Sequence, residues 1–211
     1  MSVAVTAARK TARKAKGDGH LRRAEILEAA ERIFVAEGYE GATIRKIADE
    51  VGVSSTALYM HFHDKACILH EICQNTLQVV LARNAEIAGR PLDPAARTRM
   101  ILESYVRWGL EHPNAYHLVY CAPPVRPLAP LPNPMSRLSQ QGYDVFASVV
   151  EEIAAQGRLR TGDAQTAAQA LWMACHGVVA LYTGRPRFPW SSPEELTRVT
   201  LDSLMNGLVV D

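Results

Sequence analysis

Residues 43–62 read TIRKIADEVGVSSTALYMHF, and this stretch has the pattern of two short helices joined by a tight turn. Thr43 is a preferred N-cap residue for the first helix, and Ser54 or Ser55 can cap the second. Gly52 lies between the two helices, where a tight turn favours a residue without a Cβ atom. The stretch therefore predicts a helix-turn-helix.

This stretch also divides into a buried side and an exposed side. Ala48 is small enough for the two helices to approach each other, and Val53 can fill the corner between them. The apolar side chains at helical spacing that form the shared core are Ile44, Ile47, Leu58 and Phe62. The face left exposed on the second helix is mostly polar and has one aromatic residue; it consists of Ser54, Ser55, Thr56, Tyr59, Met60 and His61. Because a helix with such a face fits the major groove of DNA, which is about 12 Å wide, the residues indicate a DNA-binding motif.

The rest of the chain shows helical periodicity and no convincing strand alternation, so we expect an all-α protein. A helix over 21–37 precedes the motif, and Gly38 is expected to end it. After the motif, Asp64 is expected to cap a long helix over 65–88. Further helices are predicted over 94–112, 113–121, 135–156 and 163–182, and from Ser192 onward, where Pro193 and Glu195 fit a capping box. The stretch from Pro123 to Pro134 holds half of the 12 prolines and is predicted to be a loop.

Length and composition indicate a globular protein. The 211 residues suffice for one large domain or two small ones, and 48% hydrophobic with 21% charged residues is ordinary. The net charge is only +1, but between Met1 and Arg23 seven Lys and Arg residues face one Asp, a local balance of 7 − 1 = +6. A flexible basic arm over 1–19 would be attracted to a polyanion, although a solvated tail is the simpler alternative.

The sequence favours a cytoplasmic protein. No apolar stretch near the start has the length of a secretion signal, although an Arg- and Ala-rich transit peptide is an alternative. The most apolar run, Leu171 to Tyr182, is too short to span a bilayer. The four cysteines contain no CxxC pair and are expected to be reduced thiols: Cys67, Cys73, Cys121 and Cys175.

The helix-turn-helix resembles the N-terminal domain of the TetR/AcrR family of bacterial repressors, whose pattern runs roughly T-x3-I-A-x2-A-G-V-S-x-G-x-L-Y-x-H-F-x2-K-x3-L. The residues that fit this pattern are Thr43, Ile47, Ala48, Gly52, Val53, Ser54, Leu58, Tyr59, His61, Phe62, Lys65 and Leu69. Val51 stands where Ala is usual, and Thr56 where Gly is frequent. The resemblance covers about residues 20–80.

This resemblance implies roles for particular residues. Thr43 and Lys65 would hold DNA phosphates at helix N-termini, where free N–H groups and the helix dipole attract anions. Tyr59 and His61 would contact the backbone or bases, and Ser55 and Thr56 base edges. The full set of candidate DNA-binding residues is Thr43, Arg45, Lys46, Ser54, Ser55, Thr56, Tyr59, Met60, His61 and Lys65. Tyr59 packing in the core, and Arg45 and Lys46 on a merely solvated face, are the alternatives.

The missing periodicity of residues 1–19 predicts a flexible arm there. The family resemblance implies a DNA-binding domain over 20–66 and a helical effector-binding and dimerisation domain over 67–211. A segment at Trp172 is similar to the Trp-x3-His-Gly pattern of one group of sensor domains. The candidate ligand-binding residues are Met100, Tyr105, Trp108, Tyr116, Tyr120, Phe146, Trp172 and His176. The candidate dimer-interface residues are Leu171, Cys175, Leu196, Val199, Ser203, Leu204 and Gly207, with burial inside a single chain as the alternative for the earlier helix.

We therefore expect a transcriptional regulator, most simply a repressor, that binds a palindromic operator as a homodimer and is released by a small apolar or weakly polar effector. The proline-rich loop 123–134 would gate the pocket or serve as a connector. An architectural DNA-binding protein without an effector is the first alternative, and an enzyme using the helical domain is the second. No histidine or cysteine cluster has the spacing of a metal site and no catalytic motif is present, so neither a metal nor a cofactor is expected. A cysteine-based redox sensor is a further alternative, but no residue near the four cysteines signals a lowered thiol pKa.

Overall fold

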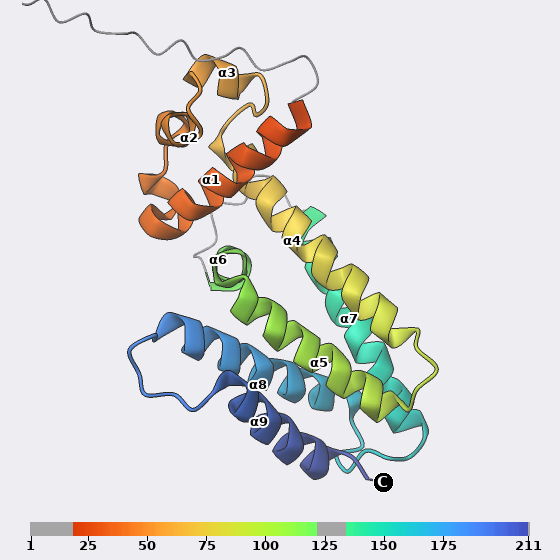
Figure 1. The fold of residues 1–211 in the computed structure, drawn as a ribbon. Coiled ribbons are helices and arrows are strands. Elements are labelled where there is room, and N and C mark those ends of the chain that lie inside the picture. Colours follow the sequence, from red (N-terminus) through yellow and green to blue (C-terminus); the bar gives the residue numbers. More distant parts are fainter. Residues whose placement is uncertain (1–18, 122–133, 211) are drawn as a thin grey trace, which may run out of the picture.

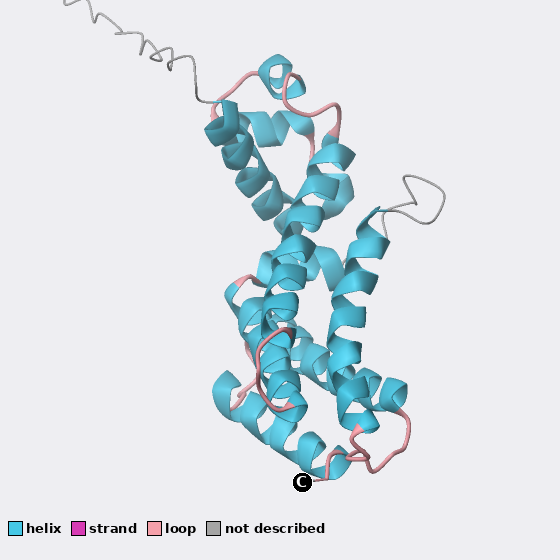
Figure 2. Ribbon diagram, turned by 90° about the vertical axis from the view of Figure 1, so that its right-hand side faces the viewer, coloured by secondary structure: helices cyan, strands magenta, loops and turns pink. Residues whose placement is uncertain are grey.

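The computed structural model describes residues 19–121 and 134–210, which are helical apart from short connections (Figures 1 and 2). Residues 1–18 of the predicted basic arm over 1–19, and residues 123–133 of the predicted proline-rich loop over 123–134, lie outside the described residues; Gly19 begins α1 and Pro134 begins α7. The elements are α1 (Gly19–Gly41), α2 (Ile44–Val51), α3 (Ser55–Tyr59), α4 (Lys65–Ala88), α5 (Pro94–Glu111), α6 (Pro113–Tyr116), the π-helical turn η1 (His117–Cys121), α7 (Pro134–Ala155), α8 (Ala164–Gly184) and α9 (Pro193–Leu208). Within the described residues the only β pairing is an isolated bridge between Leu159 and Val209, so the all-α prediction is confirmed.

The predicted caps position the two helices of the helix-turn-helix. The Thr43 hydroxyl accepts a hydrogen bond from the Lys46 amide at 3.2 Å, and the Ser54 hydroxyl accepts one from the Ala57 amide at 3.1 Å. Gly52 has φ 73°, a left-handed conformation that a side chain would strain. Of the two serines offered as caps, Ser54 has this role. α3 ends at Tyr59, and Met60 and His61 form a turn.

α1 is longer than predicted. Gly38 has φ 72° and kinks the helix, as expected of a terminating glycine, but the chain resumes a helical turn that continues to Gly41. The extra turn places Tyr39 beside Phe34, with their rings stacked 5.9 Å apart. The kink thus turns the end of α1 toward α2 without ending the helix.

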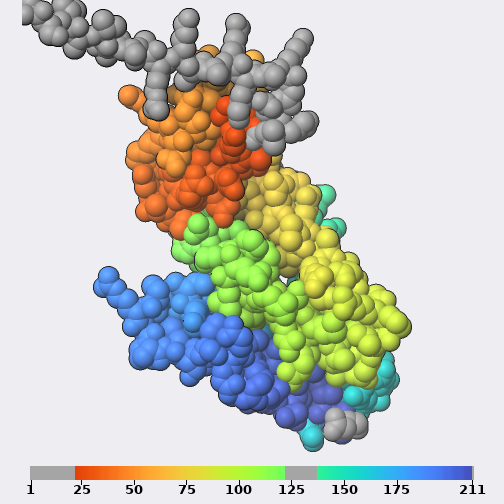
Figure 3. All heavy atoms as spheres, viewed as in Figure 1, coloured from red at the N-terminus to blue at the C-terminus, as the bar shows by residue number. Residues whose placement is uncertain are grey.

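Two hydrophobic clusters divide the molecule into two lobes. The first joins α1, α2 and α3 to the start of α4; its largest members are Ile26, Phe34, Ile47, Leu58, Phe62 and Ile68. The second lies among α4, α5, α7, α8 and α9 and includes Ile87, Ile101, Leu102, Val150, Leu171 and Leu201. α4 contributes to both clusters and runs from one lobe into the other (Figures 1 and 2). Figure 3 shows the two lobes stacked end to end, with α6 beneath α1.

Three helices of the larger lobe begin at side-chain caps, and Ser192 is the one that the sequence predicted. The Asp93 carboxylate accepts from the Ala95 amide at 2.9 Å, and the Asp163 carboxylate accepts from the Gln165 amide at 3.1 Å. The Ser192 hydroxyl accepts from the Glu195 amide at 3.2 Å, which is one half of the predicted capping box. The Glu195 carboxylate instead pairs with Arg198, 2.7 Å away, one turn further along the helix.

The predicted short helix over 113–121 has two parts. Pro113–Tyr116 is α-helical, and His117–Cys121 forms a π-helical turn. π-Helical turns are rare and often mark functional positions. This turn lies where the two lobes meet. No helix in the described residues is both long and apolar enough to cross a membrane.

Gly109 allows α5 to cross α8 closely. A Cβ atom at Gly109 would lie 2.7 Å from Cγ1 of Val179 and 3.3 Å from the Tyr116 ring. We expect Gly109→Ala to lower the free energy of unfolding by about 2 kcal/mol, since overpacking costs about 1–3 kcal/mol and outweighs the gain of about 1 kcal/mol in helix propensity. Urea unfolding would measure this loss.

Gly142→Ala is the matched control. Gly142 also lies inside a helix, but nothing stands within 4 Å of the position of its added Cβ atom. This variant should be as stable as the wild type or more stable, by up to about 1 kcal/mol. Equal urea midpoints for the two variants would contradict the close crossing.

Candidate functional site

α3 presents one buried side and one exposed side. The Leu58 side chain is fully buried in the N-terminal cluster, whereas the neighbouring Tyr59 and Met60 are 56% and 85% exposed. Ser55 is partly buried, and Thr56 is exposed on the same short helix. His61 is partly buried and follows the helix end. Tyr59 therefore does not pack in the core, and its ring and hydroxyl are free to contact another molecule.

The cationic side chains at the start of α2 have different surroundings. Arg45 projects into solvent, and its nearest acidic partner is Asp49 at 3.8 Å. The Lys46 ammonium forms an ion pair with Glu37 and donates to the Gly41 carbonyl oxygen at 3.0 Å. Arg45 is thus free to reach an anion, whereas Lys46 would first have to leave Glu37.

Lys65, at the start of α4, points back toward the end of α1. Its ammonium donates to the carbonyl oxygens of Tyr39 at 2.7 Å and Ala42 at 3.1 Å, and it lies 4.2 Å from the centre of the Tyr39 ring. Lys65 therefore holds the connection between α1 and α2 in place. The Asp64 side chain caps α4 through the Cys67 amide, and this hydrogen bond keeps the pKa of the Asp64 carboxyl below its ordinary value.

Arg23 is a positioning residue that the sequence analysis did not single out. Its guanidinium donates to the His61 carbonyl oxygen at 2.7 Å and to the Glu71 carboxylate at 2.8 and 2.5 Å, and it stacks 4.1 Å from the centre of the Phe62 ring. Arg23 thereby fixes the end of the helix-turn-helix against α1 and α4. Arg23 lies three residues before the buried Ile26, and nothing in the sequence around it indicates this role.

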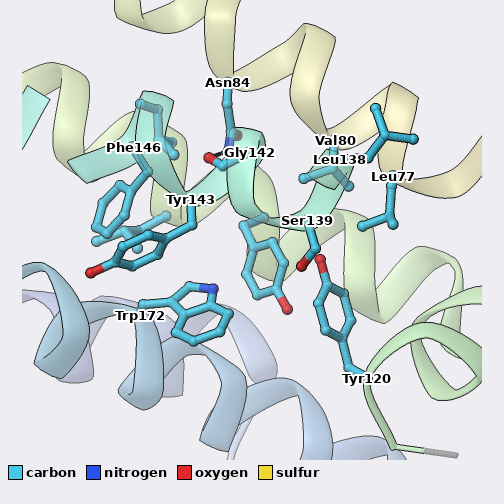
Figure 4. A pocket seen from close by; sticks show the side chains of 13 residues that line it. Leu77, Val80, Asn84, Tyr120, Leu138, Ser139, Gly142, Tyr143, Phe146 and Trp172 are labelled. Carbon is cyan, nitrogen blue, oxygen red and sulfur yellow. Dashed lines mark hydrogen bonds between the residues drawn. The ribbon is translucent and has the colours of Figure 1, made fainter. Parts of the chain in front are cut away.

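A small aromatic cavity lies between α4, α5, α7 and α8 in the larger lobe. Figure 4 shows Asn84 and Trp172 on opposite sides of it, with the Tyr120 and Ser139 hydroxyls pointing toward each other. None of its 13 lining residues, all within the described part of the chain, is an acid, a lysine or an arginine. The cavity has about 30 Å³ of free space, room for a water molecule or two, so a larger ligand requires it to open.

His176 is the centre of a polar cluster behind this cavity. Its two ring nitrogens lie 3.0 Å from the Tyr105 and Tyr116 hydroxyls, and its ring packs against Tyr120 at 4.8 Å and Trp172 at 4.5 Å. Burial lowers the pKa of His176 to about 4. Burial also raises the pKa of Tyr105 and Tyr116, and it raises that of Tyr120 to about 12. The cluster is therefore uncharged at neutral pH.

The structure separates the candidate ligand-binding residues into three groups and leaves Met100 outside all of them. Tyr105, Tyr120, Phe146 and Trp172 line the cavity. Trp108 lines an open groove outside it, and Tyr116 and His176 form the layer behind it. Met100 is partly buried against the core and lines neither hollow.

The sequence analysis missed the α4 and α7 walls of the cavity. These residues recur at helical spacing without any other signal; they are Leu77, Val80, Asn84, Leu138, Ser139, Gly142 and Tyr143. The Tyr143 hydroxyl is buried with no hydrogen-bond partner among the described residues.

Two segments connect the cavity to the DNA-facing lobe. α4 places Ile68 and Ile72 in the N-terminal cluster and Leu77 and Asn84 at the cavity. The segment around η1 makes a second connection, because Leu118 packs against the N-terminal cluster whereas Tyr120 lines the cavity.

The candidate dimer residues do not share one surface. Leu171 and Cys175 are each 1% exposed and pack in the core of their own chain, so their side chains have no surface left for a partner. Val199, Ser203 and Gly207 are exposed on α9, and Leu196 and Leu204 are partly buried. The sequence analysis missed two exposed apolar residues on the outer side of α8, Met173 and Leu181.

The cysteines and the acidic residues suggest neither a thiol site nor a metal centre. Burial raises the pKa of Cys73 to about 11 and that of Cys175 to about 12, which keeps both thiols protonated. All four cysteines are free, and Cys67 and Cys121 are exposed. The described residues include no group of three or more His, Cys, Asp or Glu side chains that could hold a metal ion.

Curated proteins similar to this chain include transcriptional repressors. HTH-type transcriptional repressor KstR2 of Mycobacterium tuberculosis is 31% identical over 104 residues, 49% of this chain and 52% of the repressor. HTH-type transcriptional repressor AcnR of Corynebacterium diphtheriae is 38% identical over 96 residues, 46% of this chain and 44% of AcnR. The chain thus spans about half the length of the curated relatives that it matches.

Solved structures share the fold over most of the chain. The structure of the ketosteroid transcriptional regulator KstR2 of M. tuberculosis has a TM-score of 0.76 at 22% identity, covering 90% of this chain and 96% of KstR2. The SmeT–triclosan complex has a TM-score of 0.72 at 20% identity, covering 90% of this chain and 93% of SmeT. At these identities the likeness establishes the fold alone.

Two family descriptions match the chain. Residues 26–72 match the bacterial regulatory proteins of the tetR family, and residues 98–204 match the tetracyclin repressor-like C-terminal domain. The second match alone covers just over half of the 211 residues. Members of this family are transcriptional regulators, which are not enzymes. The chain belongs to the TetR family of bacterial regulatory proteins.

Proposed function

We propose that this chain is a transcriptional repressor that binds a palindromic operator as a homodimer and leaves it when a small molecule binds the larger lobe. The observation that carries this proposal is the exposed face of α3. A capped, well-anchored short helix presents Thr56, Tyr59 and Met60 to solvent while Leu58 fixes it from behind. Such a helix can enter the major groove, where side chains distinguish base pairs.

The anchoring residues support this function because they fix both ends of α3 and the connection that leads into α2. Arg23 bonds the chain at His61, Ser54 caps the N-terminus of α3, and Lys65 secures the connection that precedes α2. Phosphate contacts would come from Arg45 and from the N-termini of α2 and α4, capped by Thr43 and Asp64. Lys65 would also contribute to phosphate binding, because it lies at the start of α4. Its ammonium would then donate both to the carbonyl oxygens of Tyr39 and Ala42 and to a phosphate.

Selection of bound sequences from a random DNA library tests the proposal. We expect enrichment of an inverted repeat with half-sites about one helical turn apart, bound at least about a thousandfold more tightly than random DNA at physiological salt. Enrichment of no sequence would contradict a regulator, and sequence-independent binding would favour an architectural protein.

The cavity supports an apolar or weakly polar effector. Its lining residues carry no charge, and the neutral His176 cluster behind it offers hydroxyl and imidazole groups for hydrogen bonds. The names of two similar proteins agree with such a ligand, because KstR2 is called a ketosteroid regulator and SmeT was solved with triclosan. An effector that opens the cavity would displace α4 and the η1 segment, and both reach the N-terminal cluster. The ligand would shift DNA binding only by its difference in affinity for the two conformations.

A homodimer would join the outer sides of α8 and α9. Met173, Leu181 and Val199 are large apolar side chains that lie exposed on these helices. Neighbouring positions on both helices are small, among them Gly177 and Gly207, so two copies can pack closely.

We propose that the DNA-binding domain ends at residue 66 and the effector domain begins at residue 67, inside the continuous helix α4. We also propose that the protein acts in the cytoplasm.

Met173→Glu should raise the dissociation constant of the dimer at least tenfold, because each subunit would bury a carboxylate at the interface. Sedimentation velocity over a range of protein concentrations would measure the change. Val79→Glu is the matched control, since Val79 is equally an exposed apolar helix residue but lies on α4. An unchanged dissociation constant in Met173→Glu would rule out this α8 surface.

A further inference from the structure

A second hollow lies directly outside the aromatic cavity, between α4 and α5. It is an open groove of about 340 Å³, and the surface in Figure 3 is indented where these two helices diverge. Val80, Asn84 and Tyr105 line both the groove and the inner cavity. The two hollows therefore share these three side chains as lining.

The groove differs from the cavity in charge. Arg83 of α4 and Arg107 of α5 line it, together with one acidic residue, Glu111. Arg83 is already engaged, because its guanidinium lies 2.8 Å from the Glu86 carboxylate and 3.4 Å from the Ser104 hydroxyl. No hydrogen bond or ion pair joins Arg107 to any residue in the described ranges 19–121 and 134–210. The groove thus offers one guanidinium without a partner and a second one nearby.

We infer that the effector is an amphipathic carboxylic acid whose apolar body occupies the aromatic cavity and whose carboxylate lies in the groove at Arg107. This inference rests on the proposed function, since it takes the cavity as the site of the apolar or weakly polar body of the effector, and it adds a charged end that lies outside the cavity, in the groove. Arg83 is the second cation, at the opposite wall of the groove.

The two environments suit the two halves of such a molecule. Inside the cavity a carboxylate would lose its hydration and meet no cation, because His176 behind the cavity is neutral. In the open groove the same carboxylate keeps part of its hydration and can accept two parallel hydrogen bonds from a guanidinium. Tyr105, which lines both hollows, would contact the ligand near the junction of its apolar body and its charged end.

Isothermal titration calorimetry with matched ligand pairs tests the inference on the full-length protein without DNA. The pairs are decanoate with decanol, and naphthylacetate with naphthylethanol, so that each carboxylate has a neutral alcohol of similar shape. We expect the better-fitting carboxylate to bind about five- to tenfold more tightly than its alcohol at low salt, a preference that should shrink as salt screens the exposed charges.

Substitutions then locate the charged end. Arg107→Gln should remove the preference for the carboxylate and leave alcohol binding within about twofold, and Arg83→Gln should reduce the preference less. Arg187→Gln is the matched control, because Arg187 is an exposed arginine in the loop between α8 and α9. The inference is overturned if neither carboxylate binds, if no carboxylate binds more tightly than its alcohol, or if Arg107→Gln weakens both members of a pair equally.

Operator binding is measured separately and without ligand, so the two failures are distinguishable. A wild-type protein that selects an operator but shows no carboxylate preference would refute only the ligand class. A protein that selects no DNA sequence would refute the proposed function, whatever it binds in the cavity.

Discussion

Tyr59→Ala should lower the affinity for the selected operator about a hundredfold while leaving the fold intact. Tyr59 is more than half exposed, next to the fully buried Leu58, so its ring contributes to a partner surface and hardly to the core. Losing one side chain that contacts bases or phosphates costs about 1.5 kcal/mol per half-site. Two half-sites in a dimer double this to about 3 kcal/mol, which corresponds to roughly a hundredfold in affinity. Electrophoretic mobility shift or fluorescence anisotropy would measure it.

Controls separate DNA contact from stability. The urea midpoint of Tyr59→Ala should stay close to that of the wild type, since an exposed substitution changes stability by about 0.5 kcal/mol or less. Tyr59→Phe removes only the hydroxyl and divides the effect between the ring and its hydrogen bond. Leu92→Ala, an exposed apolar change in the loop between α4 and α5, should leave operator affinity unchanged. An operator affinity in Tyr59→Ala equal to that of the wild type would remove α3 as the reading helix.

The second large effect is a loss of stability in mild acid caused by His176. Its pKa is about 4 in the folded protein, against an ordinary value of 6.5, because burial disfavours the charged imidazolium. Above pH 6.5 the imidazole is neutral in both states, and its contribution to stability is fully present. As the pH falls from 6.5 toward 4, the unfolded chain binds the proton first, so the free energy of unfolding decreases by about 3 kcal/mol in total.

Urea unfolding at pH 7.0, 5.5 and 4.5 would measure this loss. His176→Gln keeps a neutral hydrogen-bonding side chain, so the variant should lose less stability over the same range although it starts less stable. Four aspartates with lowered pKa values affect stability in a different pH range. Their contribution to the free energy of unfolding is lost only below about pH 4; they are Asp64, Asp93, Asp163 and Asp202. Glu31 has a raised pKa because it is half-buried, which favours the folded state slightly as the pH falls toward that value. Parallel pH profiles for wild type and His176→Gln would show that His176 does not titrate as the structure implies.

The local structure of the chain could be predicted closely because it depends on short-range chemistry. Thr43, Ser54, Asp64 and Ser192 cap helices through hydrogen bonds to amides three residues away, as predicted. A sequence pattern contains both partners of such a bond. The positions that were misjudged involve competition from further contacts, as at Glu195, whose carboxylate pairs with Arg198 in place of closing the capping box.

A candidate site was easier to predict the closer its residues lie to one another along the chain. The exposed face of α3 follows from one helix and its period, and Tyr59 and Met60 are exposed as expected. The cavity needs four helices, and only four of its aromatic lining residues were recognised: Tyr105, Tyr120, Phe146 and Trp172. Asn84, Val80 and Leu138 line it without any chemical feature that marks them in the sequence.

The sequence by itself determined the helical class, the order of the helices, their caps and the residues that α3 presents, because each depends on neighbours within one or two helical turns. Only the tertiary structure decided which side of α8 is buried, and it enclosed Leu171 and Cys175 in the core while leaving Met173 and Leu181 outside. It alone brought Arg23 to His61, His176 between two tyrosines, and Arg107 beside the cavity. These arrangements depend on how whole helices cross, and the crossings are set by packing among residues far apart in the chain, such as Gly109 against Val179.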